Sequence, residues 1–178
     1  MGGNIEVKST LGVGTTFTVN IPLGMLTDEI MPQKEKLSTD NKEKYDFSGK
    51  RVLLVEDHKL NVIVAKKLLE FKNARVDVAE NCKAGLEMFA AAPEHTYDMV
   101  LMDIRMPIMD GLESAKGIRS LKGAWAQIVP IIAMSANAFE DDVIKSKEAG
   151  MNVHLAKPIE SVLFYQTINR FMPQKGDK

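Results

Sequence analysis

The sequence predicts an α/β protein built on a doubly wound parallel sheet, and three observations lead to that fold class. Strand-like and helix-like segments alternate between residues 50 and 172. The first strand-like segment, residues 51–55, is apolar after its first residue, as strands covered by helices on both faces are. The helix-like segments have apolar residues at helical spacing. Five strand-helix units within about 120 residues fit a parallel sheet with helices on both faces.

Each element follows from the pattern of its own segment. In the first helix, Ile63, Val64 and Leu68 lie on or near one face, which indicates a buried stripe. Gly150 follows the fourth helix as a C-terminal cap, a position that favours glycine. We expect strands at residues 51–55, 74–78, 99–102, 128–134 and 152–155, and helices at residues 60–71, 83–91, 111–121, 138–149 and 159–171.

The first 23 residues have the different pattern of a β-hairpin. Ile5 and Val7 alternate with polar neighbours, and Phe17 and Val19 do the same. A glycine-bearing turn, residues 9–15, separates the two segments. Because an isolated hairpin is marginally stable in water, we expect this one to pack against something else.

These patterns divide the chain into four parts. The hairpin occupies residues 1–23. Residues 24–49 are a linker, because they are polar, of mixed charge and without the apolar period of a buried element. Residues 50–172 form the α/β domain, and residues 173–178 form a tail.

The composition excludes several classes of protein. The 23 basic and 24 acidic residues give a net charge of −1, so bulk charge favours neither nucleic-acid nor membrane-surface binding. No apolar run approaches the roughly 20 residues that span a bilayer, and the polar N-terminal residues are unlike a secretory signal. The single cysteine, Cys82, cannot form an intrachain disulfide, which fits a reducing compartment. We therefore expect a cytoplasmic chain without direct contact to nucleic acid or membrane.

Five polar side chains fall at the ends of the predicted strands. Glu56 and Asp57 follow the first strand, Asp103 ends the third, Ser135 ends the fourth and Lys157 follows the fifth. In an open parallel sheet, sites form outside the carboxyl ends of the strands. We therefore expect these residues to meet in one shallow pocket.

The chemistry of this pocket points to a phosphoryl group. Three crowded carboxylates repel one another, and a divalent cation relieves that repulsion. An all-oxygen, carboxylate-rich site favours a hard ion, and Mg²⁺ is the one that we expect. Phosphoryl transfer depends on positioning and charge neutralisation, which the cation, the lysine and the serine hydroxyl would supply. One carboxylate can then act as the nucleophile.

These residues lie in segments that resemble the receiver domain of two-component response regulators. The resemblance covers about residues 50–172, and its motifs are specific when taken together. It implies a flavodoxin-like fold with five parallel strands in the order 2-1-3-4-5. The first helix is most similar to that of receivers fused to hybrid histidine kinases. The matching segments are Val52-Leu53-Leu54-Val55-Glu56-Asp57, Asp103-Ile104-Arg105-Met106-Pro107-Ile108-Met109-Asp110-Gly111, Met134-Ser135-Ala136 and Lys157-Pro158.

The resemblance implies how the acceptor and the metal are arranged. Asp103 is the phospho-acceptor. Asp57 and Asp103 bind Mg²⁺ directly, together with the backbone carbonyl of Arg105. Glu56 supports the metal through water.

The resemblance also implies how the phosphoryl group is held and reported. Ser135 donates a hydrogen bond to a phosphoryl oxygen, Lys157 pairs with the phosphoryl group, and the Lys157–Pro158 bond is expected to be cis. One position departs from the family's pattern, because His154 stands where Tyr or Phe usually rotates to report phosphorylation. Either His154 swings in the same way, with a charge that makes the response pH-sensitive, or it has no special role.

The hairpin resembles another part of the same signalling proteins. Residues 1–9, 12–17 and 21–23 are similar to the end of the ATP-binding domain of histidine kinases. This implies the C-terminal piece of a hybrid sensor kinase, whose parent protein is a histidine kinase. The motifs that hold Mg-ATP are absent, so we expect this chain to catalyse only its own phosphorylation and dephosphorylation. The implied partners are the phosphohistidine of the kinase dimerisation domain and a histidine phosphotransfer protein.

Two other functions fit parts of the pattern. An interaction module would dock on the kinase core without being phosphorylated, and the presence of all five site groups counts against it. A small phosphohydrolase with an aspartyl intermediate needs an acid-base aspartate two residues after its nucleophile. Arg105 stands at that position, which disfavours this alternative.

Overall fold

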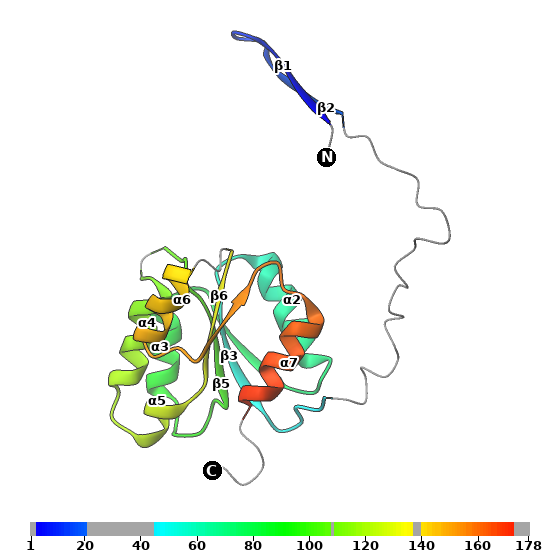
Figure 1. The fold of residues 1–178 in the computed structure, drawn as a ribbon. Coiled ribbons are helices and arrows are strands. Elements are labelled where there is room, and N and C mark those ends of the chain that lie inside the picture. Colours follow the sequence, from blue (N-terminus) through cyan, green and yellow to red (C-terminus); the bar gives the residue numbers. More distant parts are fainter. Residues whose placement is uncertain (1–2, 21–44, 108, 137–139, 173–178) are drawn as a thin grey trace. The chain divides into compact units, whose positions relative to one another are not determined.

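The computed structural model describes residues 3–20, 45–107, 109–136 and 140–172. The chain divides into two compact units, residues 1–40 and 41–178. The first contains the hairpin and the second the α/β domain (Figure 1). Most of the predicted linker, the hairpin residues 21–23 and the predicted tail lie outside the described residues.

The first unit contains an antiparallel hairpin, as predicted. Strands β1 (Asn4–Thr10) and β2 (Gly14–Asn20) pair along their whole length. Gly12 in the turn has a φ of 78°, a left-handed conformation that glycine adopts without strain. Four apolar side chains lie opposite one another on one face of the hairpin, and each is more than half exposed: Ile5, Val7, Phe17 and Val19.

The second unit is a five-stranded parallel sheet flanked by helices, which confirms the predicted fold class. The strand order is β4-β3-β5-β6-β7, or 2-1-3-4-5 when the strands of this unit alone are counted. The strands are β3 (Arg51–Val55), β4 (Arg75–Ala79), β5 (Met99–Asp103), β6 (Ile131–Ser135) and β7 (Val153–Ala156). The helices are α2 (Lys59–Glu70), α3 (Cys82–Ala91), α4 (Gly111–Ser120), α5 (Ala124–Ile128), α6 (Glu140–Glu148) and α7 (Ser161–Phe171).

Helices cover both faces of this sheet. Helices α3, α4, α5 and α6 lie on one face, and α2 and α7 lie on the other (Figure 1). Successive side chains of a strand point to opposite faces, so Val100 and Met102 of β5 enter one core and Met99 and Leu101 enter the other. This two-sided burial explains why the central strands are continuous apolar runs in the sequence.

The prediction of a strand at residues 128–134 was wrong at its beginning. Strand β6 starts at Ile131, directly after Pro130, which has no N–H group to donate to a neighbouring strand. Ile128 is instead the last residue of the short helix α5, which was not predicted. Trp125 of this helix is buried, and its indole N–H donates to a backbone carbonyl over 2.8 Å. Apolar residues alone do not distinguish a short buried helix from a strand.

The other predicted elements of this unit agree with the structure to within two residues at each end. Helix α6 begins beside residues 137–139, which lie outside the described residues. Gly150 has a φ of 86° and its N–H donates to the carbonyl of Lys147, as expected for the cap of α6.

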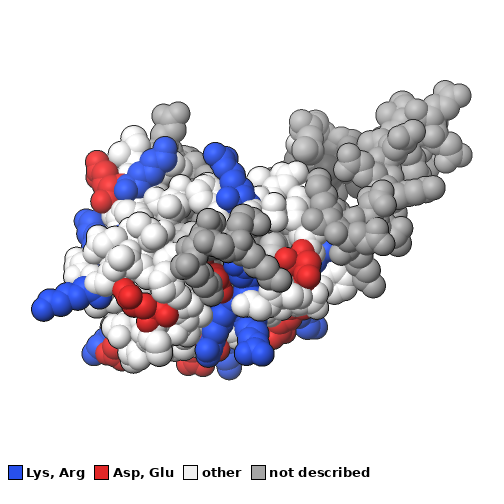
Figure 2. Space-filling model, turned by 90° about the horizontal axis from the view of Figure 1, so that it is seen from below, with Lys and Arg blue, Asp and Glu red and all other residues white. Residues whose placement is uncertain are grey.

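None of the described helices combines the length and the apolar character needed to cross a membrane. On the face seen from below in Figure 2, basic and acidic side chains are interspersed. Neither sign of charge dominates the described residues on this face.

Candidate functional site

The carboxyl ends of four neighbouring strands bring the predicted site residues together. Strands β3, β5, β6 and β7 are consecutive in the sheet. Glu56 and Asp57 follow β3, Asp103 ends β5, Ser135 ends β6, and Lys157 follows β7. Parallel strands place all their carboxyl ends at the same edge, so residues that are distant in the sequence meet there.

Lys157 connects two of the carboxylates. Its Nζ atom is 2.6 Å from Oε2 of Glu56 and 2.7 Å from Oδ2 of Asp103. Only 13% of the lysine side chain is exposed. The peptide bond between Lys157 and Pro158 is cis, as expected. Lys157 thus pairs with two of the three carboxylates, and Asp57 is the third.

Glu56, Asp57 and Asp103 form an acidic cluster whose donor atoms fit a cation. One carboxylate oxygen from each residue lies within 4.8 Å of those of the other two. Glu56 and Asp103 are buried and Asp57 is exposed, so the cluster is reached from solvent on the Asp57 side. Carboxylate oxygens are the donors that hard divalent cations prefer. The cluster is therefore a candidate metal site.

Hydrogen bonds fix both oxygens of the Glu56 carboxylate. Oε1 accepts from the side-chain amide of Asn61 over 2.9 Å and from the backbone N–H of His58 over 3.3 Å. Oε2 accepts from Lys157. These hydrogen bonds hold the Glu56 carboxylate in a fixed position, so it can orient the groups beside it.

Asp103 is held by the backbone that follows it. Its Oδ1 atom accepts from the backbone N–H of Arg105 over 3.1 Å. Helix α4 approaches closely at Gly111, where an added Cβ atom would lie 2.5 Å from the carbonyl oxygen of Asp103. Asp110 caps this helix, because its Oδ1 atom accepts from the backbone N–H of Glu113 over 2.8 Å. Asp110 and Gly111 together thus allow α4 to begin close against the end of β5.

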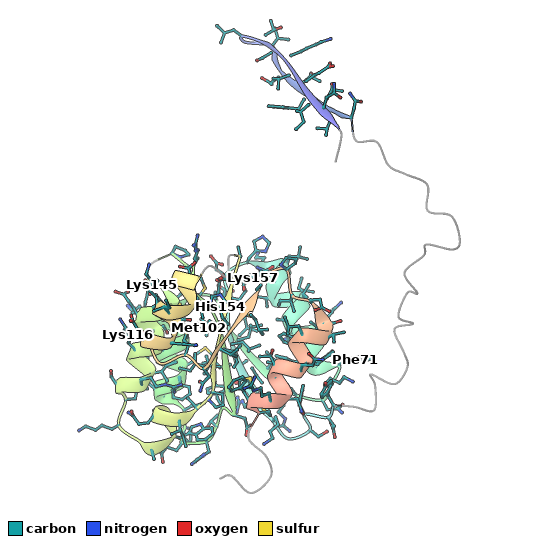
Figure 3. The ribbon with its side chains drawn as sticks, in the orientation of Figure 1. Phe71, Met102, Lys116, Lys145, His154 and Lys157 are labelled. Carbon is teal, nitrogen blue, oxygen red and sulfur yellow. The ribbon has the colours of Figure 1, made fainter. Side chains whose placement is uncertain are left out.

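Ser135 and His154 form a hydrogen bond that the sequence did not predict. Oγ of Ser135 is 2.7 Å from Nε2 of His154. Burial lowers the pKa of His154, and the charge of Asp142 opposes that shift. Figure 3 shows His154 and Lys157 near the same end of the sheet. The contact depends on the pairing of β6 with β7, so no local motif could have indicated it.

The side chain of Arg105 makes a second contact that the sequence did not predict. Its Nη2 atom is 3.2 Å from Oδ2 of Asp142, which joins the loop after β5 to helix α6. The role expected for Arg105 concerns its backbone carbonyl, so the ion pair is a separate feature. The arginine side chain is well exposed, and such pairs contribute little to stability.

Comparison with known proteins identifies the domain that contains this site. The family model described as the response regulator receiver domain matches residues 52–169. The aerobic respiration control sensor protein ArcB of Escherichia coli is 35% identical over 178 residues, which are 100% of this chain and 22% of that protein. The autoinducer 2 sensor kinase/phosphatase LuxQ of Vibrio parahaemolyticus is 33% identical over 96% of this chain and 19% of that protein. The chain thus spans about a fifth of the length of these curated relatives.

Solved structures agree with the family match. The receiver domain of the sensor histidine kinase PA1611 of Pseudomonas aeruginosa, solved with a magnesium ion in its active site cleft, is 32% identical with a TM-score of 0.63. That match covers 70% of this chain and 98% of that one. The chemotaxis protein CheY4 of Vibrio cholerae, 22% identical over 69% of this chain and 98% of its own with a TM-score of 0.63, supports the fold alone. The chain belongs to the response regulator receiver domain family, the receiving modules of phosphorelay signalling.

Proposed function

We propose that Asp103 accepts a phosphoryl group from a phosphohistidine, with Mg²⁺ held beside it by the acidic cluster. The observation that supports this most directly is the position of Lys157, whose ammonium group is hydrogen-bonded to Asp103. A fixed positive charge next to a carboxylate nucleophile stabilises the negatively charged phosphoryl group during its transfer.

The proposed reaction exchanges one bond to phosphorus for another. The P–N bond of the phosphohistidine breaks while a carboxylate oxygen of Asp103 forms a P–O bond, and the departing imidazole takes a proton from solvent. Lys157 pairs with the phosphoryl oxygens, and the hydroxyl of Ser135 donates a hydrogen bond to one of them. The product is an acyl phosphate, which then loses its phosphoryl group to water or to a second histidine.

The metal would be held by residues that already lie together. Asp57, Asp103 and the backbone carbonyl of Arg105 would bind Mg²⁺ directly, and Glu56 would support it through water. When bound, the ion adds the positive charge that stabilises phosphoryl oxygens during transfer.

Asp103 is the best acceptor among the three carboxylates. Both oxygens of Glu56 are engaged by donors from its own loop, from α2 and from Lys157. Asp57 is exposed, beside the first turn of α2. Asp103 lies at the end of β5, between the strands that lead to Glu56 and to Ser135. A phosphoryl group on Asp103 would therefore be within reach of groups from both sides.

The proposed donor would dock over the amino-terminal half of α2. Leu60 and Ile63 are at least half exposed there. A cleft of about 410 Å³ adjoins the acidic cluster, lined by Glu56, Asp57, Lys59, Val62, Ile63, Val78 and Glu80. We propose that a helix bearing the donor histidine lies against this apolar surface, which brings its imidazole to Asp103.

The donor and the recipient belong to a longer signalling protein and its partners. We propose that the donor is the phosphohistidine of a kinase dimerisation domain in a parent hybrid histidine kinase. A separate histidine phosphotransfer protein is the proposed recipient. Phosphohistidine is made from ATP, so the domain would act on the cytoplasmic side of the membrane.

Incubation with acetyl phosphate and Mg²⁺ tests the acceptor. We expect intact-mass spectrometry to show the gain of one phosphoryl group, which Asp103→Asn abolishes and EDTA prevents. Asp110→Asn is the matched control, because asparagine caps a helix as well as aspartate does and Asp110 lies outside the acidic cluster. This variant should be phosphorylated like the wild type.

Two results would contradict the proposal. If the wild type gains no mass with acetyl phosphate or with a phosphorylated histidine donor, the domain is a docking module. If Asp103→Asn is still phosphorylated while remaining folded, the acceptor is another residue.

A further inference from the structure

A chain of hydrogen bonds connects Asn61 to Asp103, the proposed acceptor. The side-chain amide of Asn61 donates to Oε1 of Glu56 over 2.9 Å. Nζ of Lys157 then bridges Oε2 of Glu56, at 2.6 Å, and Oδ2 of Asp103, at 2.7 Å. Asn61 is the third residue of α2. The chain therefore runs from the helix over which the donor would dock to the residue that would be phosphorylated.

The Asn61 amide is the main support of one Glu56 oxygen. Of the two donors to Oε1 among the described residues, it is the nearer, since the backbone N–H of His58 is 3.3 Å away. Glu56 is 1% exposed, and a buried carboxylate oxygen that loses its donor is unfavourable. Without Asn61, the carboxylate would turn toward its remaining donors, and Oε2 would leave the position from which it holds Lys157.

The first turn of α2 shows that the Asn61 amide serves Glu56 and not the end of its own helix. In a capping box, the side chain of the third helical residue reaches back to the backbone N–H of the N-cap. Here the N-cap is His58, and within the described part of the chain its side chain caps no N–H group of α2. The Asn61 amide instead reaches past the N-cap to Glu56. The backbone of Glu56 is fixed separately, because its N–H donates to the carbonyl of Ala79 over 3.0 Å.

We propose that Asn61 is a positioning residue for phosphoryl transfer, which holds Glu56 so that Lys157 stays beside Asp103 and the acidic cluster keeps its shape for Mg²⁺. This inference rests on the proposed function. Asn61 acts through Glu56, in the way that hydrogen-bond partners outside a metal site orient the groups that hold the metal.

Mg²⁺ affinity and the rate of phosphorylation test this role. Asn61→Ala should weaken Mg²⁺ binding, measured by isothermal titration calorimetry, by about ten-fold. Phosphorylation by acetyl phosphate at a subsaturating Mg²⁺ concentration should slow by a similar factor. Asn73→Gly is the matched control, because the Asn73 amide also donates to a carboxylate, that of Asp46, over 2.9 Å beyond the other end of α2. Its φ of 66° suits glycine, so both quantities should stay at their wild-type values.

A double-mutant cycle shows whether Asn61 acts through Glu56. In a Glu56→Ala background, Asn61→Ala should have no further effect on Mg²⁺ affinity, because the carboxylate that it orients is missing. The positioning role would be overturned if Asn61→Ala bound Mg²⁺ as tightly as the wild type, or if its effect were equally large without Glu56.

The ammonium group of Lys157 provides a readout that needs neither metal nor phosphoryl donor. Its ¹⁵N–¹H signal should be observable in the metal-free wild type, because a buried, hydrogen-bonded ammonium group exchanges its hydrogens slowly with water. Asn61→Ala should broaden this signal beyond detection, and Asn73→Gly should preserve it. A missing signal in the wild type, or an unchanged one in Asn61→Ala, would contradict the inference.

These readouts separate the positioning role from the proposed function. A wild type that no donor phosphorylates would refute the proposed function, while the Mg²⁺ affinities and the Lys157 signal would still decide whether Asn61 orients Glu56. A wild type that is phosphorylated on Asp103, with Mg²⁺ affinity and Lys157 signal unchanged in Asn61→Ala, would overturn the positioning role alone.

Discussion

At the scale of single residues, the site depends on buried neighbours as well as on the groups that would contact phosphate. Cys82 is fully buried, and its thiol lies 3.9 Å from the backbone carbonyl of Asp103. Burial, followed by the charges of Asp103, Asp110 and Asp57, raises the pKa of this thiol to about 12. The thiol is therefore neutral across the physiological range, and it packs beside the backbone of Asp103.

We predict that Cys82 is inert in the folded domain. Because only the thiolate reacts, and the raised pKa keeps the thiol protonated, alkylation by iodoacetamide at pH 8.5 should be on the order of 1,000-fold slower in the folded chain than in urea. Mass spectrometry of timed samples measures both rates. Comparable rates in the two states would mean that the pocket beneath Asp103 opens readily or that the thiol is ionised.

The sequence predicted that the candidate site residues lie near one another, but not the contacts among them. Asp103 and Ser135 could be placed together because each ends a strand of a parallel sheet, and topology alone brings such ends to one edge. The hydrogen bond of His154 to Ser135 needs the lateral pairing of β6 with β7 and the reach of an imidazole. The ion pair of Arg105 with Asp142 likewise joins two loops that share no local pattern.

At the scale of elements, the junction of β5 and α4 sets the position of Asp103, the proposed acceptor. Gly111 is the first residue of α4, and an added Cβ atom would lie 2.5 Å from the carbonyl oxygen of Asp103 and 2.8 Å from Cα of Ile104. Both are backbone atoms, so they cannot move aside as the end of a side chain can. Glycine is needed here for close approach, in a helix position where its φ is not unusual.

We predict that Gly111→Ala displaces the end of β5. The free energy of unfolding should fall by about 1–3 kcal/mol, as overpacking in a tight site does, and phosphorylation by acetyl phosphate should slow. Gly117→Ala in the same helix is the matched control, because its Cβ would meet only the Leu86 side chain, at 2.7 Å. Urea unfolding of both variants gives the comparison, and equal stabilities would refute the close-approach argument.

The segment before β6 shows where the prediction from hydrophobic patterns was wrong. Ile128 was assigned to the strand, yet it is the last residue of the short helix α5, and Val129 and Pro130 connect that helix to β6. The indole hydrogen bond of Trp125 and the proline before β6 decide between the two structures. The hydrophobic periodicity of the sequence reveals neither of these two features, because a five-residue helix makes little more than one turn.

At the scale of the whole molecule, the α/β unit packs residues that precede its first strand. Phe47 is 2% exposed, and its backbone N–H donates to the carbonyl of Lys72 over 2.7 Å. Tyr45 stacks on Tyr165 of α7 at a centroid distance of 5.9 Å. The hairpin, in contrast, exposes its apolar face, including Phe17. We therefore predict that the folding unit of the α/β domain begins near Tyr45 and that Phe47 is part of its core.

Two phenylalanine substitutions test that division. Phe47→Ala should lower the free energy of unfolding by about 3–5 kcal/mol, because it removes a buried aromatic ring and leaves a cavity. Phe17→Ala, an identical change at an exposed position of the hairpin, should alter it by less than about 0.5 kcal/mol. Urea titrations followed by the fluorescence of Trp125, which lies in the α/β unit, report on this unit alone. If Phe17→Ala were the more destabilising change, the hairpin would have to be part of the same cooperative unit as the receiver domain.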